Sequence, residues 1–104
     1  MIKLCLADDI APGTAQRFDV AGHRVALVRI DSDFYAIGDR CSHADVSLSE
    51  GEVLADAKEL ECWKHGSTFS LETGEPSCLP ATRAVPTYRT VVCDGAVYVE
   101  EEAG

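Results

Sequence analysis

Two short stretches of the chain each place a cysteine beside a histidine. Cys41 and His43 open the stretch CSHADVSLSEG, and Cys62 and His65 open CWKHGSTFSLETG. The chain has only three histidines, and two of them lie here. In a reducing cytosol disulfides are unlikely, and metal ligation is the first alternative for such cysteines. The residue types therefore predict one metal centre with two sulfur and two nitrogen ligands, supplied by two separate loops.

Two kinds of centre use such a ligand set. Zinc sites with two cysteines and two histidines usually pair Cys-x2–4-Cys with His-x3–5-His, and these spacings are absent. The observed order is Cys-x-His, eighteen residues, then Cys-x-x-His. Mixed loops of this kind are not typical of zinc sites and favour another kind of metal centre. A zinc-stapled interaction module remains as the alternative from a different class.

The elements that must hold these loops are short and rich in β-branched residues. We expect an all-β, antiparallel fold, a small sandwich or barrel, formed by a single domain over residues 1–104. Asp94-Gly95 lies between two β-prone runs and predicts a type I′ hairpin turn. The expected strands are Ile2–Leu6, Gln16–Val20, Arg24–Ile30, Phe34–Ile37, and two runs within residues 88–100.

A loop-rich segment interrupts these strands. It holds both cysteine–histidine stretches and spans residues 41–80 approximately, which predicts a metal-binding subdomain inserted between strands. Within it, Val53–Leu54 and Glu59–Glu61 are expected to pair as a small hairpin that links the two loops. The remaining histidine, His23, is expected in a hairpin turn with no functional role.

The pattern resembles the Rieske [2Fe–2S] domain, and the resemblance extends over nearly the whole chain. Beyond the four ligands it includes LSEG, His65-Gly66, Phe69, the Thr73-Gly74 pair and the proline-bearing PSCLPA. It is closest to the small ferredoxins of aromatic-ring-hydroxylating dioxygenases, which share a similar SLSEG ending of the first loop. The resemblance implies one [2Fe–2S] cluster per chain, with Cys41 and Cys62 on one iron and His43 and His65 on the other.

The resemblance also implies roles for residues around the cluster. Ser67 matches a serine that donates a hydrogen bond to the cluster, and Phe69 replaces a tyrosine found in high-potential relatives. Val46 and Lys64 stand where those relatives have a disulfide. Trp63 is expected to pack or to shield the cluster, Lys64 to be solvated, and Pro80 to stiffen a covering loop with Pro76.

These departures predict a potential in the lower part of the Rieske range, which runs from about −150 to +300 mV. The direction of that range follows from charge. An oxidised cluster with two thiolates is formally neutral, whereas four thiolates would give it two negative charges. Adding an electron to the neutral centre is easier.

Composition limits the partners. The net charge of −9 disfavours nucleic acid, whose phosphates would be repelled. No stretch reaches the ~20 apolar residues of a membrane span, and no signal peptide is evident, so we expect a cytoplasmic protein.

The three remaining cysteines, Cys5, Cys78 and Cys93, are expected to have packing roles. Cys5 and Cys93 lie in apolar, strand-like runs and are expected in the core, whereas Cys78 lies in the proline-bearing loop.

No motif indicates a substrate site, so we expect an electron carrier and not an enzyme. The resemblance implies one electron taken from a flavin-dependent reductase and delivered, by transient docking, to a terminal Rieske non-haem iron oxygenase. Two alternatives are the small subunit of a nitrite reductase and a Rieske protein associated with iron–sulfur assembly.

Overall fold

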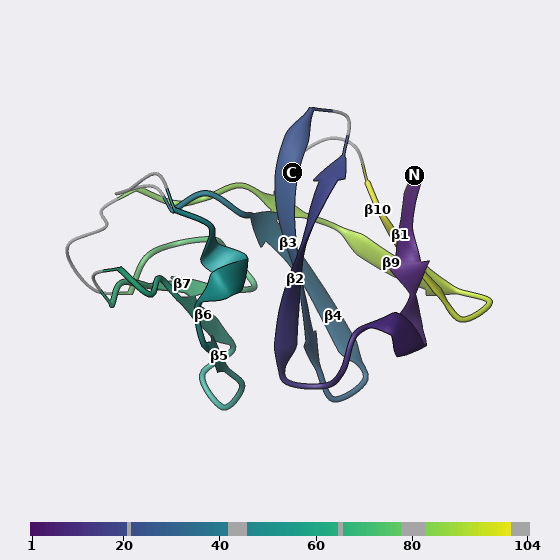
Figure 1. Ribbon diagram of the computed structural model, residues 1–104, viewed down its shortest axis with the longest axis horizontal. Coiled ribbons are helices and arrows are strands. Elements are labelled where there is room, and N and C mark those ends of the chain that lie inside the picture. Colours follow the sequence, from purple (N-terminus) through teal and green to yellow (C-terminus); the bar gives the residue numbers. More distant parts are fainter. Residues whose placement is uncertain (21, 42–45, 65, 78–82, 101–104) are drawn as a thin grey trace.

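The computed structural model describes residues 1–20, 22–41, 46–64, 66–77 and 83–100. These residues form ten strands and two short 3₁₀ turns, with no α-helix among them (Figure 1). The elements are β1 (Ile2–Leu6), η1 (Ala7–Asp9), β2 (Thr14–Val20), β3 (His23–Ile30), β4 (Asp33–Gly38), η2 (Leu48–Glu50), β5 (Val53–Leu54), β6 (Glu59–Glu61), β7 (Thr68–Ser70), β8 (Thr87–Tyr88), β9 (Thr90–Cys93) and β10 (Ala96–Val99).

The strands form three antiparallel sheets, ordered β1-β10-β9, β2-β3-β4-β8 and β5-β6-β7. In Figure 1 the four-stranded sheet lies between the other two, and β1, near the N-terminus, pairs with β10, near the C-terminus. The expected all-β antiparallel fold, with a subdomain inserted between strands, is confirmed. No helix in the described part of the chain has the length and apolar character that crossing a membrane would require.

Strand β3 is the centre of the packing, because it is buried on both faces. Four consecutive residues, Val25 to Val28, are buried. Successive side chains of a strand point to opposite faces, so Ala26 and Val28 enter one hydrophobic core while Val25 and Leu27 enter the other. The first core faces β5–β7, and the second faces β1 and β10. Strand β3 thus contributes to the cores on both sides of its sheet.

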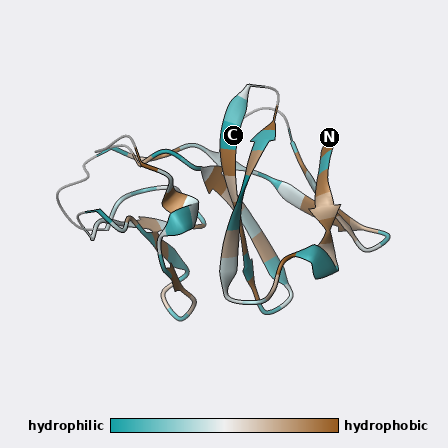
Figure 2. Cartoon of the chain, viewed as in Figure 1, coloured by the Kyte–Doolittle hydropathy of each residue, from teal (hydrophilic) through white to brown (hydrophobic). Residues whose placement is uncertain are grey.

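The polarity of the first two elements, β1 and η1, matches their burial. In Figure 2 the η1 turn is hydrophilic, whereas β1, directly before it, is largely hydrophobic. The η1 turn contains Asp8 and Asp9 and has no buried residue, while Ile2, Leu4 and Cys5 pack against the second core.

Most predicted strands and the Asp94-Gly95 turn are confirmed, and one turn needs correction. The Asp94-Gly95 turn has positive φ at both residues, 52° and 75°, as a type I′ hairpin requires. His23 does not lie in a turn: it is the first residue of β3 and pairs with Val20. The turn ends one position earlier than expected, at Gly22, whose φ of 84° a histidine would adopt only with strain.

The C-terminal run also divides where one strand was expected. Residues 87–88 pair with β4 as β8, and residues 90–93 pair with β10 as β9. The two parts of this run therefore belong to two different sheets.

Candidate metal centre

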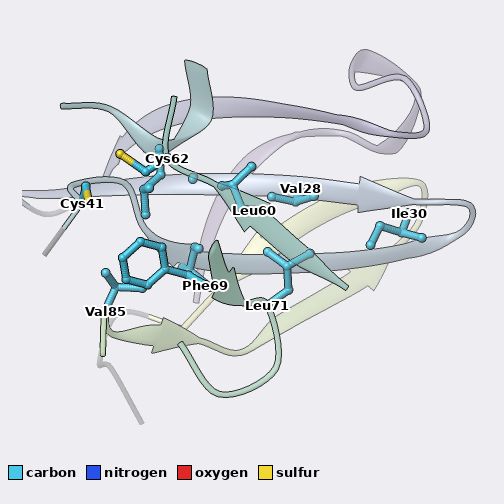
Figure 3. Close-up of a cluster of buried hydrophobic side chains, with 11 residues drawn as sticks. Val28, Ile30, Cys41, Leu60, Cys62, Phe69, Leu71 and Val85 are labelled. Atoms are coloured by element: carbon cyan, nitrogen blue, oxygen red, sulfur yellow. The ribbon is translucent and has the colours of Figure 1, made fainter. Parts of the chain in front are cut away.

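The two cysteines each follow a strand and are buried. Cys41 comes three residues after the end of β4, and Cys62 directly follows β6. Their exposed fractions are 2% and 1%, and both belong to the first hydrophobic core. In the view of Figure 3 they lie towards the same end of this core, with Ile30 towards the other end. The fold therefore brings together two thiols that are twenty-one residues apart in the sequence.

The two cysteine loops have the same length and the same closure. The Cys41 N–H donates to the Val46 carbonyl at 3.1 Å, and the Cys62 N–H donates to the Ser67 carbonyl at 2.7 Å. In both loops the bond spans from the cysteine to the fifth residue after it. The flanking residues pair across each loop, Arg40 with Ser47 and Glu61 with Thr68. Each loop is thus a six-residue hairpin connection that begins with cysteine.

The first loop is braced by a buried acid that the sequence analysis did not identify. Asp39 is fully buried. One of its carboxylate oxygens accepts a hydrogen bond from the Ser47 hydroxyl, and the other accepts one from the Ser49 N–H at 2.9 Å. The signal in the sequence was a lone acid between an apolar strand and Cys41. An acid in that place is also compatible with ordinary solvent exposure.

The two loops are connected through Gly51, the last residue of LSEG. A Cβ at this position would lie 1.6 Å from the Glu61 carbonyl oxygen, so only glycine fits. The Glu61 N–H donates to the Glu52 carbonyl at 2.9 Å. The segment that ends the first loop therefore lies directly against the residue that precedes Cys62. The predicted β5–β6 hairpin is confirmed with its predicted bounds.

Phe69 supports both loops from within the core. It is fully buried on β7, in the core cluster that contains Cys41 and Cys62, and Val85 lies close to its ring in Figure 3. Strand β7 was not predicted, because a three-residue run between polar residues gives little periodicity. Pro76 forms an isolated bridge with Phe69, and the hydroxyls of Thr68 and Ser77 are hydrogen-bonded. The start of the third, proline-bearing loop is thereby attached to β7.

The residues expected around the cluster differ in exposure. Ser67 is buried at the end of the second loop. Trp63 is 53% exposed, so it is not the packed anchor that was one of the two expectations. Lys64 is exposed, as predicted, and Val46 is partly buried. Trp63 and Lys64 thus present an aromatic and a cationic side chain on the surface directly after Cys62.

Several expected site residues lie outside the described residues: His43, His65, Pro80 and Cys78. Within the described part of the chain, no group of three or more histidine, cysteine or acidic side chains is placed to hold a metal ion. Neither Cys41 nor Cys62 is joined in a disulfide in the described part of the chain. Two buried cysteines in one apolar core fit the sulfur half of a mixed ligand set.

Of the other cysteines, one expectation needs correction. Cys93 was expected in the core but is exposed. It pairs with Ala96 at the end of the β9–β10 hairpin, beyond the cover of the core. Cys5 is partly buried, and burial, followed by the charge of Asp9, raises the pKa of its thiol. Neither cysteine belongs to the core that contains Cys41 and Cys62.

The comparisons with known proteins agree with this geometry. Residues 1–89 match the family model described as the Rieske [2Fe–2S] domain. The 3-phenylpropionate/cinnamic acid dioxygenase ferredoxin subunit of Photorhabdus laumondii is 40% identical over 96 residues, which cover 92% of this chain and 90% of the relative.

Solved structures give the same result. The ferredoxin of carbazole 1,9a-dioxygenase from Nocardioides aromaticivorans IC177 has a TM-score of 0.92 and 34% identity, covering 98% of this chain and all of that one. A ferredoxin from a complex of reduced oxygenase and oxidised ferredoxin in carbazole 1,9a-dioxygenase has a TM-score of 0.91 and 38% identity, covering 99% and 94%. A nitrite reductase small subunit is less similar, with a TM-score of 0.83 and 29% identity, covering 95% and 96%.

Proposed function

Because the chain belongs to the Rieske [2Fe–2S] domain family, we propose that it is the ferredoxin of an aromatic-ring-hydroxylating dioxygenase system. It carries electrons and does not itself catalyse the oxygenation. The observation that carries this proposal is the similarity to dioxygenase ferredoxins along almost the full chain, combined with two buried cysteines at the starts of two loops of equal length.

Four residues hold the cluster in this proposal. Cys41 and Cys62 bind one iron, and His43 and His65 bind the other. A bound [2Fe–2S] cluster supplies reversible uptake of a single electron at moderate potential. The chain contributes the rest: the loop hydrogen bonds fix where the two sulfurs lie, and the apolar core around Phe69 excludes water from them. In this proposal Ser67 of the second loop and Phe69 on β7 are neighbours of the cluster, while Pro80 stiffens the loop that covers it.

The charge distribution supports docking to basic surfaces. Residues 46–77 contain seven acidic and two basic side chains, whereas residues 1–40 contain six acidic and five basic ones. Most of the negative charge of the described part is therefore concentrated in the subdomain that holds the cysteines. Complementary charge steers association and raises its rate. The partners are a flavin-dependent reductase and a terminal oxygenase, each bound transiently, with Trp63 and Lys64 at the contact.

Two further features complete the proposal. Residues 1–104 act as one domain, with residues 41–80 as its cluster-binding part, because β3 and β4 contribute to both cores. The protein works in the cytoplasm, where thiols remain reduced and are available to a metal centre.

The first experiment asks which centre the protein holds. Protein purified without oxygen should be red-brown, contain about two irons and two sulfides per chain, and give a rhombic EPR signal after reduction. A colourless protein that holds zinc would instead support an interaction module and overturn the proposal.

The second experiment separates the dioxygenase carrier from a nitrite reductase subunit, which the similarity to a nitrite reductase small subunit keeps as the second candidate. The reduced protein should pass its electron to a separate Rieske oxygenase and be reduced again by a flavin reductase. Stable co-purification with a nitrite reductase, without transfer to any oxygenase, would favour the second candidate.

A further inference from the structure

We propose that Asp39 is a positioning residue for the first cluster loop and that its buried negative charge lowers the reduction potential of the protein. The inference rests on the proposed function, since it concerns the cluster that Cys41 helps to bind. Asp39 is itself no ligand in this proposal, because both oxygens of its carboxylate are already hydrogen-bonded within the loop.

Asp39 connects the two ends of the loop through three consecutive residues. Its carboxylate accepts from the Ser47 hydroxyl and from the Ser49 N–H, and its backbone carbonyl accepts from the Leu48 N–H at 2.5 Å. Its own N–H donates to the Arg24 carbonyl on β3 at 2.9 Å. The loop is therefore fixed both to itself and to the central sheet immediately before Cys41.

The two serines form a directed chain toward this carboxylate. Ser47 and Ser49 hydroxyl oxygens lie 2.9 Å apart. The Ser47 hydroxyl has a single proton, which it donates to Asp39. The Ser49 hydroxyl must therefore donate to Ser47. Every hydrogen bond in this chain therefore points toward the Asp39 carboxylate, which fixes its position within the loop.

Burial gives this charge its effect on the cluster. An exposed charge is screened by water and salt, whereas a buried one acts through a lower effective dielectric. Reduction of a cluster bound by Cys41 would add one negative charge two residues along the chain from Asp39. A buried negative charge at Asp39 would disfavour that addition and lower the potential.

The second loop has no such acid. Its flanking residue Glu61 is only partly buried, and the loop closes through the β6–β7 ladder instead. The electrostatic contribution of Asp39 is thus specific to the cysteine side of the first loop. It offers a reason for low potential that is independent of the replaced tyrosine and the missing disulfide.

Three variants of the cluster-loaded protein test the proposal. Asp39→Asn keeps an oxygen acceptor and the side-chain shape but removes the charge, so the midpoint potential should rise. Ser47→Ala leaves the charge and removes a donor that partly offsets it, so the potential should fall. Glu50→Gln is the matched control: the same chemical change at an exposed acid near the same loop, with a much smaller shift. Redox titration followed by EPR measures all three.

Shifts of opposite sign for Asp39→Asn and Ser47→Ala would support an electrostatic role, because simple loosening of the loop would move both potentials the same way. An Asp39→Asn shift no larger than that of Glu50→Gln would overturn it. If Asp39→Asn holds no cluster, Ser47→Ala decides: a fall in potential supports the inference, and no change or a rise overturns it.

The positioning role has its own readout. Asp39→Ala should lower the iron content per chain, while Asp39→Asn should restore it, as judged by iron and sulfide analysis. Full occupancy in Asp39→Ala would overturn this half of the inference. A wild-type protein without the rhombic EPR signal would instead contradict the proposed function itself, so the two failures are distinguishable.

Discussion

The two cysteine loops close in the same way but are supported differently. Both use a hydrogen bond from the cysteine N–H to the carbonyl of the fifth residue after it. The second loop continues a ladder of three residue pairs between β6 and β7. The first loop has one isolated pair, Arg40 with Ser47, and depends on the side chain of Asp39. One backbone geometry can therefore be specified either by a strand ladder or by a single buried acid.

The largest expected effect, loss of the cluster, should be the same for both loops. Replacing either Cys41 or Cys62 by serine should abolish cluster binding, since in the proposed function each supplies one of two sulfur ligands to the same iron. Iron and sulfide content and the visible spectrum measure the loss. Cys93→Ser is the control, because Cys93 is exposed and outside both loops, and it should keep the cluster. Retention of the cluster in one ligand variant but not the other would show that the loops are not equivalent.

Phe69 should affect both loops together. Truncating this fully buried side chain to alanine should destabilise the protein by about 3–5 kcal/mol, as large core deletions do. Denaturant unfolding measures the change, and iron content should fall as well. Phe18→Ala removes a partly buried ring from the other core and should have a smaller effect on stability and none on iron content. Equal loss of iron in both variants would contradict a specific support of the loops by Phe69.

Gly51 tests the connection between the loops. Gly51→Ala places a Cβ against the Glu61 carbonyl and should destabilise the protein by about 2–3 kcal/mol, since backbone must move to admit it. The neighbouring Glu52→Ala changes only an exposed side chain and should stay within about 0.5 kcal/mol of wild type. Thermal unfolding of both variants measures the difference, and a wild-type melting temperature for Gly51→Ala would contradict the tight junction.

The smallest effect distinguishes the two kinds of support directly. The Cys41 N–H should exchange with solvent faster than the Cys62 N–H, by about tenfold, because a single bridge opens more readily than a ladder end. Asp39→Ala should accelerate exchange at Cys41 and leave Cys62 nearly unchanged. Hydrogen exchange followed by NMR or mass spectrometry measures both amides. Equal acceleration in the two loops would mean that Asp39 acts on the whole subdomain.

The sequence predicted the parts of this arrangement whose signals are local. The β5–β6 hairpin and the Asp94-Gly95 turn depend on neighbouring residues, and both were placed correctly. Strand β7 was missed because Thr68–Ser70 is too short to show a period, and its strand state follows from pairing with β6. Cys93 was misplaced because an apolar run does not reveal which of its residues extend beyond the core.

The same distinction between local and non-local signals applies to the residues of the site. The cysteines could be predicted from residue type and spacing, and the structure buries both. Asp39 could not, since an acid before a loop is usually solvated, and only the approach of Ser47 and Ser49 from across the loop makes it a buried brace. Interactions between residues eight or ten positions apart are set by the fold, not by the local pattern.

The paired flanks of the loops have a consequence for protein engineering. Residues paired across antiparallel strands have Cα atoms only about 4.5–5.5 Å apart, so each six-residue loop leaves and re-enters the framework through almost the same point. Either loop could be exchanged for another of equal length without moving the strands beneath it. The redox properties of the protein could therefore be varied by replacing one loop at a time, while the strands that carry the loops stay the same.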